Sequence, residues 1–421
     1  MIHNFIFPTL SHLSSLIIQF SDQIFSEYGN AFISILLLSS LFDSSFSTHS
    51  LSLSGDSVVA PCRMPQSSTD SSADRPEFDC GLYFFDYKII RKLGSGGYGS
   101  VYEVEKDGGS YALKAEIVNK KNSGSLRAEA VTLRRAQSSD HVCRLYLSAQ
   151  CLSGEYKINL MVMSLLTYPL NKLRRACPEQ RFTRSTALRL AIQSVQAIED
   201  VHSIGYLHRD IKAGNFAMSP DRRVVLIDFG FAREYVVYDA EKKSCRLRGQ
   251  RKYAHFVGTT RYCSKKVHER KEQSRRDDLW GWLYMIVEMI TGSLPWSELD
   301  DKKIGEMKMS IGSQLYDSCP KELYHIHDHL DSLRFFSKPN YELIKRYLKK
   351  ACDRCEVKES DPFDWEKGGR YDDICEKIEK DRKREAEKAE IEKKKKEEKM
   401  MQEKKKNTEK WVDKKEYSLE E

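Results

Sequence analysis

The pattern of apolar and polar positions divides the chain into a strand-rich part followed by a helix-rich part. Over residues 86–117 the sequence DYKIIRKLGSGGYGSVYEVEKDGGSYALKAEI predicts three short strands, with turns at Gly94–Gly99 and at Gly108-Gly109. The segment SLRAEAVTLRRA, which begins at Ser125, predicts a helix. We expect folded structure to begin near Leu82.

Two longer segments have clear helical periodicity. In TRSTALRLAIQSVQAIEDVHSIG the apolar residues recur at 188, 191, 192, 195, 198 and 201, with Thr183 as the predicted N-cap and Gly205 as the stop. The segment DDLWGWLYMIVEMITG predicts an apolar helix that ends at Gly292. This order of elements predicts an α+β fold, and 421 residues suffice for one large two-lobed domain with tails or for two to three ordinary domains.

The first 80 residues differ in composition from the rest and predict a disordered leader. Their best apolar run, Ala31–Phe42, has 12 residues, whereas about 20 are needed to span a bilayer. It lies too far from the start for a secretory signal, so we expect neither a membrane anchor nor secretion. An alternative is that translation starts at Met64 and that residues 1–63 are an extension of the gene model. Residues 65–77 have the composition of a polar linker.

Residues 367–421 form a charged tail, and its central stretch, residues 376–406, is almost all charge. Glu and Lys recur four residues apart, which supports a solvated helix, and apolar residues are too few for the seam of a coiled coil. We expect a charged tail that is helical or disordered, with a docking arm for acidic surfaces as the alternative.

Charge and cysteine content narrow the function classes. The net charge is +7, and the excess lies within residues 81–365, because the first 80 residues are acidic and the tail is nearly neutral. This distribution favours acidic or phosphorylated partners over nucleic acid. The 11 cysteines are scattered, and the one close pair, Cys352 and Cys355, predicts reduced thiols more readily than a metal site. We expect an intracellular protein, in the cytoplasm or the nucleus.

The sequence GSGGYG (Gly94–Gly99) fits a glycine-rich loop whose backbone can approach phosphate oxygens. Alone it is also compatible with a dinucleotide fold or an ordinary hairpin. A second strand follows it here instead of a helix, and YALK then places Lys114 on a third strand, where Glu129 on the next helix is its natural partner. The predicted nucleotide-binding residues are Gly94, Ser95, Gly96, Gly97, Gly99, Val101, Ala112, Lys114 and Glu129.

The sequence HRDIKAGNF is a more specific signal. Asp210 is predicted to accept or orient the proton of an attacking hydroxyl, and Lys212 to offset the charge of a transferring phosphoryl group. Asn215, five residues after Asp210, and Asp228, in the sequence DFG, are the predicted metal ligands. The alternative for each is a loop residue that makes turn hydrogen bonds.

Together these motifs resemble those of the eukaryotic protein kinases, over residues 83–366. The resemblance implies a two-lobed fold, with a small β-rich N-lobe that holds one helix and a larger helical C-lobe. It also implies ATP and Mg²⁺ as cofactors and Asp210, Lys212 and Lys114 as catalytic residues. Lys212, two residues after Asp210, and Thr259 are typical of serine/threonine kinases.

A finer resemblance is to the casein kinase 1 family. The segment GTTRYCS followed by EQSRRDDLW replaces the Ala-Pro-Glu triplet of most kinases, as that family does, and LDSLRFFSKPNYELIKRYL and FDWE match its last helices. DHVCRLY and LRLAIQSVQAIEDVHSIGYLHRDIKAGNFAM are most similar to the tau-tubulin kinase branch, including its nematode-type members. Asp278 matches a buried aspartate that braces the catalytic loop. Ala213-Gly214 and Lys265-Lys266 depart from the family pattern.

The resemblance implies protein substrates that are acidic or already phosphorylated. Arg261 matches an arginine that helps bind an anion beside the catalytic site, and the basic segment Lys242–Lys252 precedes it. A monomer that needs no activating phosphate is expected. The alternatives are a pseudokinase that serves as a binding scaffold, and an interaction protein that acts through its charged tail.

Overall fold

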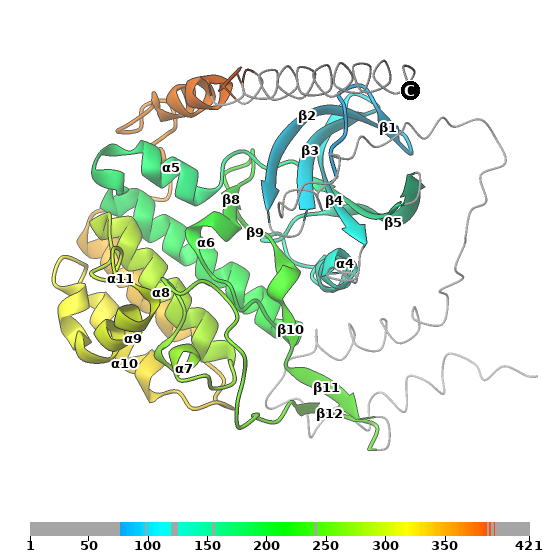
Figure 1. Cartoon of the computed structure of the whole chain (residues 1–421). Helices are drawn as coiled ribbons and strands as arrows, with labels where there is room; N and C mark the ends of the chain where they lie inside the picture. The colour runs from blue at the N-terminus through cyan, green and yellow to red at the C-terminus, as the bar shows by residue number, and fades with distance from the viewer. Residues whose placement is uncertain are drawn as a thin grey trace, which may run out of the picture.

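The computed structural model describes residues 76–96, 99–118, 125–153, 156–239, 242–384, 387–388 and 391. They form a β-rich lobe above a larger helical lobe (Figure 1). The predicted leader, the run Ala31–Phe42, the start at Met64, Gly97 of the glycine loop and most of the charged tail lie outside the described residues. None of the described helices is both long and apolar enough to cross a membrane.

The N-lobe is a six-stranded antiparallel sheet in the order β1-β2-β3-β4-β6-β5. The three strands predicted over residues 86–117 are confirmed as β2, β3 and β4, and the turn between β3 and β4 falls at 107–108, one residue before its predicted place. The inward side chains of β3, Tyr102 and Val104, are fully buried. The strands are β1 (Tyr83–Phe84), β2 (Tyr87–Gly96), β3 (Gly99–Lys106), β4 (Gly109–Val118), β5 (Leu145–Ser153) and β6 (Tyr156–Ser164).

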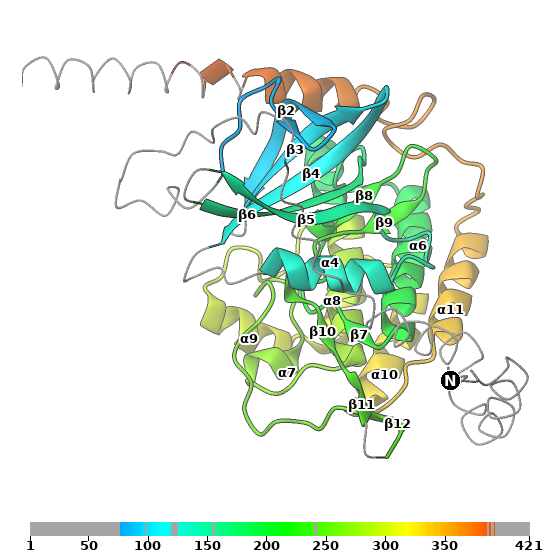
Figure 2. The same ribbon diagram turned by 90° about the vertical axis from the view of Figure 1, so that its right-hand side faces the viewer.

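Helix α4 (Ser125–Arg135) lies between the sheet and the helical lobe (Figure 2). Its residues Leu126, Ala130 and Leu133 recur at helical spacing and are buried in the same apolar cluster as the C-lobe helices. Glu129 shares this inward face. The helix therefore connects the two lobes and presents one carboxylate to the space between them.

The C-lobe is built around α8 (Arg275–Thr291), which is buried on nearly every face. The helix begins in a capping box formed by Ser274 and Asp277, and it ends at Gly292, as predicted. Helix α6 (Arg184–Ser203) packs against α8, and the hydroxyl of Thr183 accepts a hydrogen bond from the N–H of Thr186, which confirms the predicted N-cap. The other helices are α5 (Leu170–Ala176), α7 (Lys265–His268), α9 (Asp301–Ser310), α10 (Glu322–Ser332), α11 (Tyr341–Arg354) and the short 3₁₀ turns η2 (Pro178–Gln180), η3 (Ala213–Asn215), η4 (Phe229–Phe231) and η5 (Gly312–Tyr316).

The described residues also form three two-stranded ribbons, two of which flank the loops at the lobe junction, while the third projects from the C-lobe (Figure 1). They are antiparallel and pair β7 (Tyr206–Leu207) with β10 (Arg233–Glu234), β8 (Phe216–Met218) with β9 (Val224–Leu226), and β11 (Val236–Asp239) with β12 (Ser244–Leu247). The loop between β7 and β8 carries HRDIKAGN, and the loop between β9 and β10 carries DFG. Both motifs therefore lie next to each other, facing the N-lobe sheet.

The packed chain extends past Trp365 into a tail helix, residues 374–384, which lies beside α5 (Figure 1). Its first residue, Ile374, is fully buried in the C-lobe cluster. The Tyr168 hydroxyl, just before α5, donates a hydrogen bond to Glu379 at 2.6 Å. This first part of the charged tail is helical and docked.

Candidate active site

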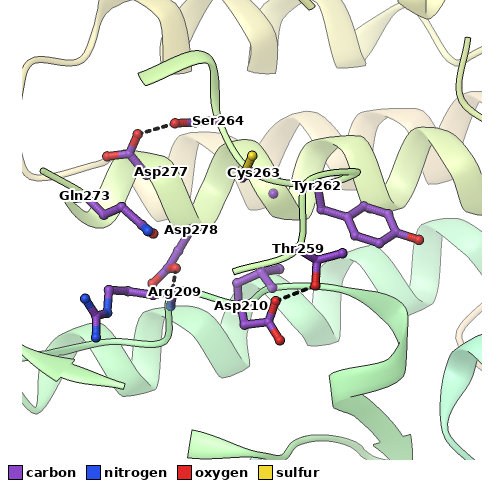
Figure 3. Close-up of a pocket in the computed structure, with 11 residues that line it drawn as sticks. Arg209, Asp210, Thr259, Tyr262, Cys263, Ser264, Gln273, Asp277 and Asp278 are labelled. Atoms are coloured by element: carbon purple, nitrogen blue, oxygen red, sulfur yellow. Dashed lines mark hydrogen bonds between the residues drawn. The ribbon is translucent and has the colours of Figure 1, made fainter. Parts of the chain in front are cut away.

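A buried carboxylate on α8, that of Asp278, holds the backbone of the loop that carries Asp210. One oxygen of Asp278 accepts the backbone N–H of Arg209 and the other accepts that of His208, both at 2.8 Å (Figure 3). The second oxygen also accepts a hydrogen bond from His202 Nε2. Burial opposes the charged form, but the hydrogen bond from His202, the nearby His202 and His208 rings and the His208 backbone N–H keep the pKa of Asp278 below its usual range. Asp278 therefore fixes the backbone from which Asp210 projects.

Asp210 is almost fully buried and has three polar side chains around its carboxylate. Its Oδ1 accepts a hydrogen bond from the Thr259 hydroxyl at 2.7 Å, and its Oδ2 accepts one from Lys212 Nζ at 2.6 Å. The Asn215 amide donates to Oδ2 at 3.1 Å and to the Asp210 carbonyl at 2.8 Å. Four predicted residues are thus joined in one hydrogen-bonded network: Asp210, Lys212, Asn215 and Thr259.

A second network joins the N-lobe to the DFG segment. Lys114 Nζ lies 2.7 Å from Glu129 Oε2 on α4 and 3.1 Å from Asp228 Oδ1. Burial opposes the ammonium charge, but the two carboxylates outweigh it and raise the pKa of Lys114 above its usual range. Burial would raise the pKa of Asp228, but the same ammonium lowers it. The lysine is charged, and both carboxylates point to the junction between the lobes.

The glycine loop lies at the end of the β2–β3 hairpin. Gly94 pairs with Val101 in the sheet register, and Val101 pairs with Lys114 on the next strand. Gly99 has a φ of +143°, and a Cβ there would overlap the carbonyl oxygen of Ala115, so the position requires glycine. Ser95 and Gly96 are exposed, and Ala112 is buried under the sheet. Gly94 and Val101 therefore lie in the same row of the sheet as the predicted phosphate-binding lysine.

Arg261 has a partner that the sequence did not indicate. Its guanidinium donates to Glu288 Oε1 at 2.6 Å and to the Ser297 carbonyl at 3.1 Å. Glu288, fully buried on α8, also accepts the Tyr262 hydroxyl at 2.5 Å and lies 3.5 Å from Arg174. Burial acts to lower the pKa of Arg261, but the Glu288 carboxylate raises it. The predicted anion site is thus one-third exposed and already ion-paired.

A cluster of arginines surrounds Glu272, another residue that the sequence reasoning missed. The buried carboxylate pairs with Arg251 and, at 3.1 Å, with Arg233. Burial acts to raise the pKa of Glu272, but these two arginines and Arg209, which precedes Asp210, lower it. Glu272 thereby pairs with an arginine just after DFG and with another before Thr259, and its charge is felt by Arg209 of the catalytic loop. The sequence signal for this cluster was the position of Glu272, an acidic residue inside the mostly basic stretch that follows Arg261.

Two oxygen donors in this site suit Mg²⁺. Asn215 directs its amide nitrogen to Asp210, which leaves its amide oxygen as a possible metal ligand, and the Asp228 carboxylate is over one-third exposed. Carboxylate and amide oxygens are ligands that Mg²⁺ prefers, with phosphates and water completing the shell. Within the described residues, no cluster of three or more His, Cys, Asp and Glu side chains could hold a metal by itself, and Cys352 and Cys355 are free thiols. The residues present fit a cation that arrives with a nucleotide.

Comparisons with known proteins agree with this geometry. A family model for the protein kinase domain matches residues 87–359. A probable serine/threonine-protein kinase of Dictyostelium discoideum is 36% identical over 288 residues, which cover 66% of this chain and 56% of that protein. A probable casein kinase I homolog of Encephalitozoon cuniculi is 30% identical over 289 residues, covering 66% of this chain and 92% of that protein. The solved structure of vaccinia related kinase 3 superposes with a TM-score of 0.55 at 18% identity, covering 68% of this chain and 94% of that one, and so shows the shared fold.

Proposed function

Because this chain belongs to the eukaryotic protein kinase family, we propose that it transfers the γ-phosphoryl group of Mg-ATP to serine or threonine hydroxyls of protein substrates. Its domain is of the serine/threonine kinase type. The single observation that carries the proposal is the pair of networks around Asp210 and Lys114, which contain every polar group that phosphoryl transfer requires of the protein. The same observation argues against a pseudokinase scaffold.

In the proposed mechanism Asp210 orients the substrate hydroxyl and receives its proton. The carboxylate is fixed by Thr259 on one oxygen, and Lys212 on the other provides positive charge next to the transferring group. The Lys212 ammonium donates to Asp210 and to the Thr259 hydroxyl oxygen, which leaves one of its three N–H groups for a phosphoryl oxygen.

Lys114, Asn215 and Asp228 are the proposed ligands of Mg-ATP. When bound, the nucleotide supplies the phosphoryl group and the cation offsets the charge of the phosphates. Lys114 would hold the phosphates, and its ion pair with Glu129 fixes the position of its ammonium group. Asn215 and Asp228 would hold the cation from the C-lobe side. Gly94, Ser95, Gly96, Gly97 and Gly99 would cover the phosphates, and Val101 and Ala112 the base.

We assign the kinase to the casein kinase 1 type, closest to its tau-tubulin kinase-like branch. The segment that replaces Ala-Pro-Glu is fully integrated in the fold, because Ser264 donates to Asp277 of the α8 capping box at 2.5 Å (Figure 3). The Glu272 carboxylate among three arginines supports activity without an activating phosphate. The enzyme would act as an intracellular monomer.

Acidic or pre-phosphorylated proteins are the proposed substrates. The support is the basic segment Lys242–Lys252, much of which lies on and after the projecting β11–β12 ribbon, where Arg246 is 60% exposed (Figure 1). A substrate phosphate at Arg261 would have to share the guanidinium with Glu288. The preference for primed substrates is therefore expected to depend on the ribbon as well as on Arg261.

The test is phosphate transfer from labelled ATP with Mg²⁺ by the full chain and by its Asp228→Asn variant. The acceptors are casein, an acidic phospho-primed peptide and the unprimed peptide of the same sequence. Transfer to Ser or Thr that is lost in the variant supports the proposal, and ATP binding without transfer contradicts it. Equal rates on the two peptides, or a rate ratio unchanged in Arg261→Ala, would overturn the proposed substrate preference.

A further inference from the structure

Lys308 is a fully buried lysine in the C-lobe. It lies on α9, which packs beside α7 (Figure 2), and its side chain is fully buried. Its ammonium lies 5.1 Å from the ring centre of Tyr284 and 5.3 Å from that of Trp296. Among the residues that the structure describes, no carboxylate forms an ion pair with it. An unpaired buried charge is costly, so its presence calls for a reason other than stability.

The ammonium instead holds the backbone of the segment 259–263. Lys308 Nζ donates to the carbonyl oxygens of Thr260 and Cys263, both at 2.7 Å. Between these two contacts, the Trp296 indole N–H donates to the Arg261 carbonyl at 2.8 Å. The carbonyl groups of this segment therefore accept three hydrogen bonds, two of them from the Lys308 ammonium and one from Trp296.

The other side of the same segment touches the catalytic network. Thr259 donates to Asp210 at 2.7 Å (Figure 3) and also accepts from Lys212 at 3.2 Å. The neighbouring Gly258 packs so closely that a Cβ there would lie 2.6 Å from the Arg209 carbonyl oxygen. Residues 259–263 therefore border the place where a peptide hydroxyl would reach Asp210.

The surroundings of Lys308 keep it cationic at neutral pH. Burial lowers the pKa of Lys308 to about 8, while the two carbonyls and two aromatic faces favour the charged form. The other titratable groups that face it carry no charge near pH 7. The pKa of Cys263 is raised by burial to about 11, that of His268 is lowered by burial to about 4, and burial also raises the pKa of Tyr284. Asp301, a carboxylate on the same helix, acts to raise the pKa of Cys263 and of His268.

We propose that Lys308 is a positioning residue for substrate recognition. It fixes the backbone position of the segment 259–263, over which the peptide substrate lies. The proposal rests on the kinase function proposed above. Lys308 touches neither nucleotide nor substrate, and it acts through the Thr260 and Cys263 carbonyls. Its removal should therefore weaken binding of the peptide and leave binding of ATP unchanged.

The experiment compares Lys308→Met with Lys302→Met, an exposed lysine of the same helix. For Lys308→Met we expect kcat/KM for the peptide to fall about ten- to hundredfold, which is the effect of about one of the two lost hydrogen bonds being felt at the peptide site. The fall should come mainly from KM for the peptide, with KM for ATP unchanged and a thermal midpoint equal to or above that of the parent. Lys302→Met should match the parent in every measurement.

Two results would overturn the proposal. One is an unchanged kcat/KM. The other is a loss confined to kcat at equal KM for both substrates, which indicates a smaller active fraction and a purely structural role. If Lys308→Met does not fold, Lys308→Gln, which keeps N–H donors without the charge, decides by the same comparison of KM values.

Amide hydrogen exchange separates this inference from the proposed kinase activity. Tyr262 and Cys263 donate their N–H groups to the Thr259 carbonyl, so a released segment should exchange faster at these amides while α8 keeps its protection. If the parent protein shows no transferase activity but Lys308→Met still exchanges faster at 259–263, the proposed function is contradicted and the role of Lys308 in holding this segment is supported. Unchanged exchange would contradict the role of Lys308 whatever the activity.

Discussion

Asp278→Asn is expected to weaken both the fold and catalysis, because one carboxylate serves two backbone N–H groups of the catalytic loop. Each lies 2.8 Å from a different oxygen of Asp278, and one of those oxygens also accepts from His202. An asparagine keeps one acceptor oxygen and turns an NH₂ group toward the other N–H. One hydrogen bond to a charged acceptor is lost, and one buried N–H is left unsatisfied.

The size of the effect follows from those two losses. A hydrogen bond to a charged group contributes about 1.5–3 kcal/mol and an unsatisfied buried donor costs about 1–3 kcal/mol. We expect the free energy of unfolding to fall by about 3–5 kcal/mol. Arg209 has a left-handed φ of +67°, so release of its N–H lets the loop relax away from this strained conformation. Displacement of Asp210 by about 1 Å would lower kcat about a hundredfold.

Urea denaturation and steady-state kinetics on the purified variant measure the two effects. Asp331→Asn, an exposed aspartate of α10, is the matched control and should change stability by no more than about 0.5 kcal/mol. KM for ATP should be unchanged, because Lys114 and the glycine loop do not contact Asp278. A loss below about 1 kcal/mol together with an unchanged kcat would refute this reasoning.

Other predictions follow from the same contacts. Lys114→Met should abolish transfer while the protein still melts cooperatively in a thermal scan, since its role is in the site. Gly99→Ala should raise KM for ATP, because the new Cβ would force the hairpin away from Ala115; an unchanged KM in a nucleotide titration would argue against the tight packing seen there. Glu272→Gln should lower kcat about tenfold and make the chain near 251–258 more sensitive to limited proteolysis, because its arginines repel each other once their shared charge is gone. Lys308 has a pKa of about 8 when folded and an ordinary value of 10.5, so at this site the unfolded chain binds more protons between these pH values. The contribution of Lys308 to stability should therefore rise with pH by about 3 kcal/mol across that window, measured in urea titrations as the difference between the parent and Lys308→Met.

The features that the sequence predicted well are those with local signals. The N-cap Thr183 and the helix end at Gly292 depend on neighbours within a few residues. The motifs around Asp210 and Asp228 have fixed spacings, so the loops that carry them can be recognised from the order of residues alone. The α+β fold with two lobes followed from the same motifs and is confirmed.

The partners that the sequence did not predict are distant along the chain. Glu288 lies 27 residues from Arg261, and the buried contacts of Lys308 bridge 45 and 48 residues. Neither pairing has a periodic pattern, and a lysine within a helix such as IGEMKMS is expected to be solvated. Burial of that lysine depends on how α9 packs beside α7 and under the rings of Tyr284 and Trp296, which is a tertiary property.

Docking of the tail helix bears on how the protein can be shortened. A chain cut after residue 366, where its motifs end, would lose Ile374, whose burial contributes about 1.5–3 kcal/mol, and the carboxylate that receives the Tyr168 hydroxyl. It would also uncover the apolar surface beneath them. For crystallisation or inhibitor screening, a shortened protein that stops after residue 384 should stay in solution at concentrations where one that stops at 366 precipitates.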